Sequence, residues 1–148
     1  MTVRRFDPAQ DDLEALALLH AARFTDAWDG PALAALLATP GTFAFHHADG
    51  FVLARSAGGE AEILTLAVAP LARGKGIGRT MMRMAAEEAA RLGAAAMFLE
   101  VGTDNAAALA LYGALGFQRV GQRKAYYGTG DAWVLKAALP LSPAGKFP

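Results

Sequence analysis

The segment from Leu66 to Thr80 constrains the fold of this chain more than any other part of the sequence. It begins with apolar residues, Pro70 ends the apolar run, and a long helical pattern of apolar residues begins at Ile77. The turn between them is rich in glycine and positive charge: Arg73, Gly74, Lys75, Gly76, Gly78 and Arg79. Glycine backbones can curl closely around an anion, and the N-terminus of a helix attracts negative charge. The segment therefore predicts a strand, a turn and a helix that bind a phosphate or pyrophosphate group.

Composition narrows the class of protein. The chain has 148 residues, 54% of them hydrophobic, which predicts one folded domain over residues 1–139 and a loose tail over residues 140–148. The absence of cysteine excludes disulfides, a thiolate nucleophile and cysteine-bound zinc. A formal net charge of zero disfavours a nucleic-acid surface. No segment resembles a signal peptide or a membrane span, so we expect a cytoplasmic protein with no membrane partner.

Hydrophobic periodicity predicts an α/β protein with a mixed sheet and helices on both faces. The expected strands cover residues 2–6, 42–47, 51–55, 62–69, 96–101, 117–127 and 132–138. The expected helices follow Asp11 or Asp12, begin near Pro31, run from 77 to 92, and run from 105 to 115. Asp49-Gly50 and Gly58-Gly59 are typical of hairpin turns.

Three kinds of phosphate-binding loop are candidates for the turn at 73–78. The nucleotide triphosphatase loop needs a glycine where this chain has Arg73, and a lysine where it has Arg79. The dinucleotide loop needs its third glycine at residue 79, so its spacing also fails, although Glu100 stands roughly where its acidic residue would lie. The third pattern, [RQ]-x-x-G-x-[GA], is satisfied by residues 73–78.

This third pattern resembles the pyrophosphate loop of the GNAT acyl-CoA N-acetyltransferases. A second motif follows at residues 100–117, EVGTDNAAALALYGALGF. It is similar to the motif of the ribosomal-protein N-terminal alanine acetyltransferases within that superfamily, and the similarity covers residues 62–136. The resemblance implies a GNAT fold of about seven mostly antiparallel strands, with a splayed central parallel pair and four helices. It also implies acetyl-CoA as cofactor.

The resemblance assigns roles in binding the cofactor. The pantetheine arm is expected to pair with the strand backbone at Leu66, Ala67 and Val68. The pyrophosphate is expected on the turn and first helical residues: Arg73, Gly74, Lys75, Gly76, Ile77, Gly78, Arg79 and Thr80. Asn105 can cap a helix by accepting a backbone N–H bond, and the resemblance adds a contact with the cofactor.

Two residues are the catalytic candidates. An attacking α-amine, with a reference pKa of about 8, must lose a proton to a base. Glu100 ends an apolar strand, where partial burial would make a carboxylate more basic. The resemblance places Tyr112 beside the thioester sulfur, where its phenol would protonate the departing thiolate. A solvated carboxylate at Glu100 and a core ring at Tyr112 are the structural alternatives.

The sequence says less about the residues that would bind the acceptor amine. Phe24, Trp28, Tyr126, Tyr127 and Asp131 could form an aromatic and acidic entrance for a peptide N-terminus. However, Gly102 and Asp104 stand where the family has arginine and serine, which leaves the acceptor open.

Several functions therefore compete. A protein N-terminal α-amine leads, and a small amine such as an amino acid, polyamine or aminoglycoside is the alternative acceptor. A non-catalytic acyl-CoA-binding domain is a further alternative. Both a monomer and a homodimer are compatible with the sequence. His46 and His47 have no partner at metal-ligand spacing and are expected to be strand residues, so no metal site is expected.

Overall fold

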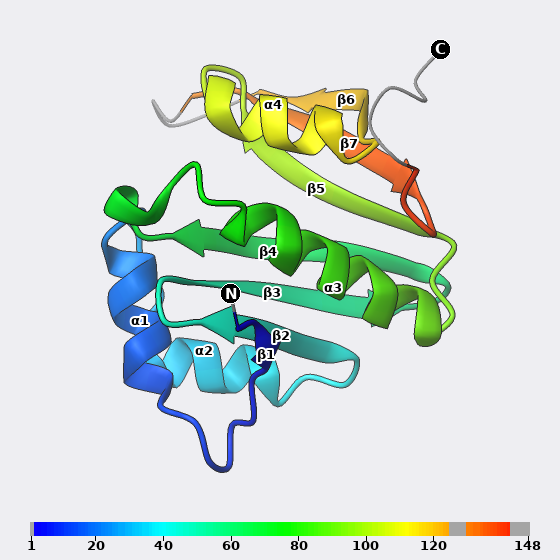
Figure 1. Ribbon diagram of the computed structural model, residues 1–148. Coiled ribbons are helices and arrows are strands. Elements are labelled where there is room, and N and C mark those ends of the chain that lie inside the picture. The colour runs from blue at the N-terminus through cyan, green and yellow to red at the C-terminus, as the bar shows by residue number, and fades with distance from the viewer. Residues whose placement is uncertain (1, 125–129, 143–148) are drawn as a thin grey trace. The chain divides into compact units, whose positions relative to one another are not determined.

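The computed structural model describes residues 2–124 and 130–142 of the chain (Figure 1). The strands are β1 (Arg4–Arg5), β2 (Thr42–His47), β3 (Gly50–Ala57), β4 (Glu60–Val68), β5 (Ala96–Gly102), β6 (Gln118–Arg123) and β7 (Ala132–Ala138). The helices are α1 (Leu13–Ala21), α2 (Gly30–Leu37), α3 (Ile77–Arg91) and α4 (Ala106–Ala114), with a short 3-10 helix at Pro70–Ala72.

The strands form one mixed sheet in the order β1-β2-β3-β4-β5-β7-β6. β4 and β5 are parallel, whereas β1–β2, β2–β3, β5–β7 and β6–β7 are antiparallel. This sheet, with its four α-helices in the described residues, confirms the predicted fold class and the order of elements.

The chain divides into two compact units, and each is described by itself. The first unit consists of the residues up to Arg55 together with Leu64–Ala85, and the second consists of Ser56–Ile63 and the chain from Ala86 on. The β4–β5 pairing runs from Glu60↔Ala96 to Glu62↔Phe98 and lies wholly in the second unit. The predicted splay beyond these pairs involves residues of both units, so it stays a prediction, as does the single domain over residues 1–139.

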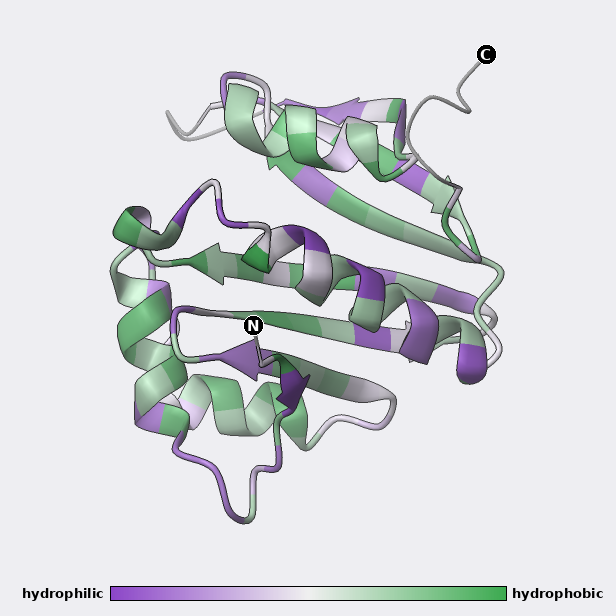
Figure 2. Cartoon of the chain, viewed as in Figure 1, coloured by the Kyte–Doolittle hydropathy of each residue, from purple (hydrophilic) through white to green (hydrophobic). Residues whose placement is uncertain are grey.

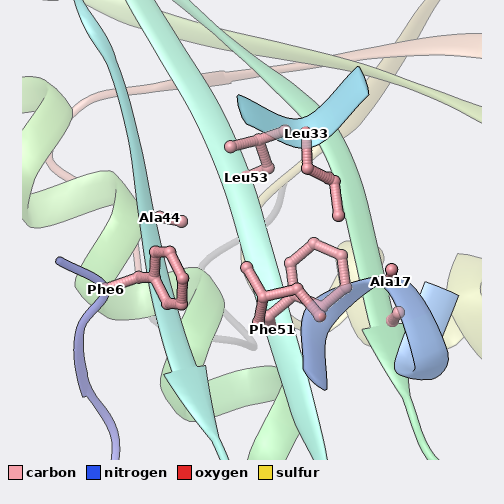
Figure 3. Close-up of a cluster of buried hydrophobic side chains, with 8 residues drawn as sticks. Phe6, Ala17, Leu33, Ala44, Phe51 and Leu53 are labelled. Carbon is pink, nitrogen blue, oxygen red and sulfur yellow. The ribbon is translucent and has the colours of Figure 1, made fainter. Parts of the chain in front are cut away.

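The first unit encloses an apolar core between two helices and the sheet. Figure 3 shows side chains from α1, α2, β2 and β3 converging on it. Its buried members are Phe6, Leu16, Ala17, Leu33, Ala44, Phe51, Leu53 and Ala67. Leu16, Leu33, Phe51 and Leu53 are at most 1% exposed, so the helical and strand patterns in the sequence point to one common core.

The helices α1 and α2 each begin at an aspartate cap; the sequence predicted the cap at Asp12 but not the one at Asp29. The Asp12 carboxylate accepts a bond from Glu14 N and caps α1. The Asp29 carboxylate accepts from Ala32 N and caps α2, with Pro31 in its first turn. Such caps contribute about 1 kcal/mol each because they satisfy N–H groups that the helix itself leaves free.

The first hairpin differs from the prediction. The register pairs His47 with Gly50, so the turn is Ala48-Asp49 and Gly50 begins β3. Gly50 does not have a positive φ, but a Cβ there would lie 2.7 Å from the Ala67 carbonyl oxygen. Close approach of two backbones therefore requires this glycine, not a turn conformation. The Gly58-Gly59 turn is confirmed, with φ of 61° and 83°.

Strand ends also differ from the prediction. The first strand covers Arg4–Arg5 alone, and β4 begins at Glu60, two residues before the expected start. β6 runs from Gln118 to Arg123, and its pairing with β7 shifts register between Arg119 and Gly121. Periodicity sets which residues share a face of a strand, but it does not set where pairing stops.

The helices differ in their polarity pattern. Figure 2 shows alternating hydrophilic and hydrophobic residues along α3 but an almost continuously apolar α4. On α3, Ile77, Met81 and Ala85 are buried, whereas Arg79 and Arg83 are exposed. α4 buries chiefly Tyr112. An amphipathic helix such as α3 covers a core with one face and leaves its cations in water.

Candidate functional site

The connection between β4 and α3 is an exposed turn shaped by glycine. Gly74 and Gly76 have φ of 78° and 82°, a region that side chains disfavour, and residues 73–76 are all exposed. A Cβ at Gly74 would meet no atom within 4 Å. The glycine there is therefore needed for its backbone conformation and not for lack of space.

Positive charge surrounds this turn. Arg73, Lys75 and Arg79 are exposed, and none of them forms an ion pair within residues 2–124 and 130–142. The first hydrogen bond into α3 joins Thr80 N to Gly76 O, so the N–H groups of Ile77, Gly78 and Arg79 precede the helical ladder. Free N–H groups, a helix N-terminus and three unpaired cations fit a pyrophosphate.

The end of β4 leads into this turn. Ala67 is fully buried, whereas Leu66 and Val68 are half-buried. The backbone at Ala67 is held close to Gly50, and Ala69 N donates to Asp49 O at 2.7 Å. The strand that would carry the pantetheine arm is therefore anchored in the core of the first unit.

Glu100 lies on β5 in the second unit, near the carboxyl end of the strand. Its side chain is 39% exposed, and Arg123 Nη1 lies 3.4 Å from its Oε1. Its neighbours Leu99 and Val101 are buried on the opposite face. The sequence predicted partial burial in an apolar setting, whereas the carboxylate has a cation beside it and access to water.

Tyr112 on α4 is only 7% exposed. Its ring packs edge-on against Phe117, with 5.8 Å between centroids. Burial raises the pKa of Tyr112 to about 12, because the phenolate loses its hydration. The phenol therefore stays protonated at every physiological pH and can act as a hydrogen-bond donor.

The loop between β5 and α4 contains Asn105 and the departures from the family motif. Asn105 Oδ1 accepts from Ala108 N at 3.1 Å and caps α4, which confirms its predicted structural role. A Cβ at Gly102 would lie 3.1 Å from Asp104 Oδ1. Asp104 therefore lies over the position that an arginine side chain at residue 102 would occupy, and the two departures are sterically linked.

The acceptor candidates are distributed over both units. Asp131 Oδ2 accepts from Gln122 Nε2 at 3.1 Å, and its carbonyl accepts from Thr103 N at 3.0 Å. Phe24 and Trp28 both stack on His20 in the first unit. Tyr126 and Tyr127 lie outside the described residues.

The predicted site residues that the structure describes divide between the two units. The first unit holds the acceptor pair Phe24 and Trp28 and the cofactor residues 66–68 and 73–80. The second unit holds Glu100, Asn105, Tyr112 and Asp131.

Sequence analysis missed three residues that lie beside these site residues. They are His20 beneath the acceptor aromatics, Gly50 against β4 and Arg123 beside Glu100. A histidine at a helical position facing the core was a signal for the first. Arg123 could be found only from the register of β5, β7 and β6, which sequence periodicity does not supply.

Among the described residues, no three histidine, cysteine or acidic side chains are grouped so that they could hold a metal ion. No described helix combines the length and apolar character that spanning a membrane requires.

The chain is similar in sequence to proteins named as acetyltransferases. The [ribosomal protein bS18]-alanine N-acetyltransferase of Escherichia coli strain K12 is 39% identical over 85 residues, 56% of this chain and 57% of that protein. Streptothricin acetyltransferase of Streptomyces lavendulae is 48% identical over 60 residues, 40% of this chain and 32% of that protein. The matched part thus spans about half or less of these relatives.

Structural similarity extends over the whole chain. The crystal structure of the ribosomal-protein-S18-alanine N-acetyltransferase from Escherichia coli aligns with a TM-score of 0.82 and 24% identity, over 99% of each chain. This shows a shared fold. The sequence model of the acetyltransferase (GNAT) family matches residues 6–117, which is most of the chain. The chain therefore belongs to the acetyltransferase (GNAT) family.

Proposed function

We propose that this protein is an acetyl-CoA-dependent N-acetyltransferase that acts on the N-terminal α-amine of a protein, of the ribosomal-protein alanine type. The observation that carries the proposal is the β4–α3 turn, where two positive-φ glycines and three cations without an ion pair among the described residues meet the start of a helix. A sequence without cysteine suits a reducing compartment, which supports a cytoplasmic location.

The residues of the turn would hold the pyrophosphate of acetyl-CoA. The N–H groups from Ile77 to Arg79 would donate to its oxygens, and Arg73 and Lys75 would neutralise its charge. The backbone at Leu66, Ala67 and Val68 would pair with the amides of the pantetheine arm, as an added strand would. Asn105 would contact the cofactor with its amide N while its Oδ1 caps α4.

Acetyl-CoA supplies a thioester whose acetyl group is transferred to the acceptor amine. Glu100 would take the proton of that amine, directly or through water, and Arg123, whose Nη1 lies 3.4 Å from Glu100 Oε1, would orient the carboxylate. The 39% exposure of Glu100 gives water room to relay the proton. Neither the acetyl transfer nor the proton transfer requires a covalent bond to the enzyme.

Tyr112 would stabilise the departing thiolate. A phenol whose pKa is about 12 is a weaker acid than a thiol, whose reference pKa is about 8.5. Complete proton transfer from Tyr112 would thus be uphill by about 5 kcal/mol in the unliganded environment. We therefore propose that Tyr112 chiefly donates a hydrogen bond to the sulfur, which revises its expected role as a proton source.

Phe24 and Trp28, together with Asp131, Tyr126 and Tyr127, would receive the acceptor. The name of the Escherichia coli relative favours an alanine at a protein N-terminus. The name of the Streptomyces relative favours a small-molecule amine as second candidate.

An acetyl-transfer assay separates these acceptors. Peptides that begin with alanine or serine and a panel of small amines, including streptothricin and polyamines, would be tested with acetyl-CoA. We expect turnover of peptides with kcat/KM at least tenfold above that of any small amine. Turnover confined to small amines would establish the second candidate, and acetyl-CoA binding without any turnover would indicate a binding domain.

The role of Glu100 is tested by Glu100→Gln. We expect kcat to fall about 10²-fold or more, because a general base typically contributes that much. The melting temperature should change little, since the lost ion pair is largely exposed and such pairs contribute under about 1 kcal/mol. Glu87→Gln, at an exposed position on α3, is the matched control and should retain full activity. A normal rate for Glu100→Gln across pH 6–9 would remove Glu100 from the mechanism.

A further inference from the structure

A buried histidine lies beneath the two aromatic residues assigned to the acceptor. His20, near the end of α1, is 4% exposed. The Phe24 ring lies 4.4 Å from the imidazole centroid at 25°, and the Trp28 ring lies 4.8 Å away at 5°. Both rings are stacked on the imidazole.

Both nitrogens of this imidazole are used. His20 Nδ1 accepts a hydrogen bond from the backbone N–H of Trp28 at 3.0 Å. A backbone N–H can only donate, so Nδ1 is unprotonated and the ring proton is on Nε2. Nε2 lies 3.2 Å from Thr65 Oγ1, to which it donates. The geometry therefore requires a neutral imidazole of one defined tautomer.

His20 also determines how the loop from Ala22 to Asp29 is held. The loop starts with bonds from Arg23 N and Phe24 N to the His20 carbonyl. From Thr25 to Trp28, the Trp28 N–H is the one backbone N–H with a partner among the described residues, and that partner is His20. The middle of the loop therefore has His20 as its hydrogen-bonding anchor.

The other side of His20 faces the core of the first unit. Phe51 on β3 lies 6.1 Å from the imidazole, and Thr65 on β4 is 8% exposed. Thr65 directly precedes Leu66–Val68, the part of β4 assigned to the pantetheine arm. One side chain thus connects the proposed acceptor loop to the strand proposed to carry the cofactor.

We propose that His20 is a positioning residue that, in its neutral form, holds the Ala22–Asp29 loop so that Phe24 and Trp28 present a fixed aromatic surface to the acceptor. The inference rests on the proposed function, because that function assigns this loop to the acceptor. His20 does not touch the reacting atoms, and its effect is on acceptor binding.

Protonation would release the loop. A second proton would have to occupy Nδ1 and would break the bond from Trp28 N–H. The groups packed on the ring, from β3, β4 and the loop itself, are uncharged: Phe51, Thr65, Phe24 and Trp28. Burial alone lowers the pKa of His20 below 6.5, and the loop's charged residues, Arg23, Asp26 and Asp29, do not contribute. Release is therefore expected only in acid.

Two substitutions of His20 each remove one of its two kinds of contact with the loop, the hydrogen bond or the ring stacking. His20→Phe keeps an aromatic ring in the stack but removes the acceptor for Trp28 N–H, whereas His20→Asn offers an acceptor near Nδ1 but removes the stack. We expect each to raise KM for an alanine-initiated peptide roughly five- to tenfold, as the loss of one buried hydrogen bond or stack implies. The KM for acetyl-CoA and kcat should stay within about twofold.

His46→Asn is the matched control. His46 is another histidine of the first unit whose pKa is lowered by burial, but it is half-buried and lies on β2 beside Phe6 and Asp11. Its substitution should leave the peptide KM unchanged. An unchanged peptide KM in both His20 variants, or an equal rise in His46→Asn, would overturn the inference.

A spectroscopic measurement tests the loop without turnover. Trp133→Phe leaves Trp28 as the one tryptophan of the sequence, and a protonated imidazole stacked on an indole quenches its fluorescence. We expect Trp28 emission to change with a midpoint below pH 6.5, and no such transition when His20→Phe is added. A transition that persists without His20 would contradict its control of the loop. Absence of acetyl transfer in the unsubstituted protein would instead refute the proposed function, and the fluorescence result would still decide the role of His20.

Discussion

At the scale of single residues, burial changes what Tyr112 can do. Its sequence position in the motif suggests an acid, and a phenol in water would titrate near pH 10. In the folded protein the ring is covered, and the pKa of Tyr112 rises to about 12. The residue is consequently better suited to donate a hydrogen bond than to release a proton.

The raised pKa of Tyr112 predicts a loss of stability in alkali. The folded state favours the protonated phenol, so this contribution is complete below pH 10 and is lost as the pH rises towards 12. The shift corresponds to about 3 kcal/mol in the free energy of unfolding. Denaturant unfolding of the unsubstituted protein and Tyr112→Phe should therefore diverge between pH 10 and 12. Parallel pH profiles for the two proteins would show that the phenol is not buried as described.

The close contact between Gly50 and β4 predicts that a side chain at residue 50 destabilises the protein. In Gly50→Ala the new Cβ would lie 2.7 Å from a backbone oxygen of Ala67, which cannot move without shifting β4. We expect a loss of about 2 kcal/mol in the free energy of unfolding, as overpacking typically causes. Gly113→Ala is the control, because its Cβ meets nothing within 4 Å and lies inside α4. It should stabilise the protein by up to about 1 kcal/mol. Equal effects of the two substitutions would contradict the close approach at Gly50.

At the scale of elements, the β4–α3 turn has a conformational requirement for glycine and a proposed role in binding pyrophosphate. Its glycines have the same left-handed backbone as those of the β3–β4 hairpin, but only the β4–α3 turn leads into a long helix flanked by cations. Comparing substitutions in the two turns therefore separates the effect of backbone strain on stability from the effect on acetyl-CoA binding.

Gly74→Ala and Gly59→Ala form a matched pair. Their φ values are 78° and 83°, and neither new Cβ meets an atom within 4 Å. Each should lower stability by about 1–2 kcal/mol, the usual penalty for a left-handed alanine. Only Gly74→Ala should weaken acetyl-CoA binding, and we expect at least a tenfold rise in Kd by titration calorimetry. Equal Kd values in the two variants would place the pyrophosphate elsewhere.

Many elements were predictable because their signals are local. Asp12 and Asn105 cap helices where the sequence predicted caps, since a cap depends on residues within one helical turn. Asp29 caps α2, for which the sequence predicted only that Pro31 lies in the first turn. The strand ends and the Ala48-Asp49 turn were not predictable, because pairing decides them. The same limit applies to Arg123, which reaches Glu100 only through the order of three strands.

At the scale of the whole molecule, ligand binding should stabilise the folded state. Acetyl-CoA at about 100 times its Kd would add about 2.7 kcal/mol, or roughly 5–10 °C in melting temperature. ATP and NAD at the same concentration should have little effect, because the turn lacks the spacing of either of their loops. Thermal scanning with the three ligands checks this, and stabilisation by ATP or NAD alone would refute the assignment of the turn.

The sequence by itself determined the family and the order of elements, and it supplied the candidate residues at the turn and at Glu100, Asn105 and Tyr112. These depend on spacing along the chain, which local backbone chemistry translates directly into structure. Only the tertiary structure decided that Tyr112 is buried, that Glu100 is paired and partly exposed, and that His20 connects the Ala22–Asp29 loop to β4. Burial, and contact between residues far apart in sequence, arise only when helices and strands pack together. A sequence motif identifies a side chain, but packing decides its exposure, its partners and its pKa.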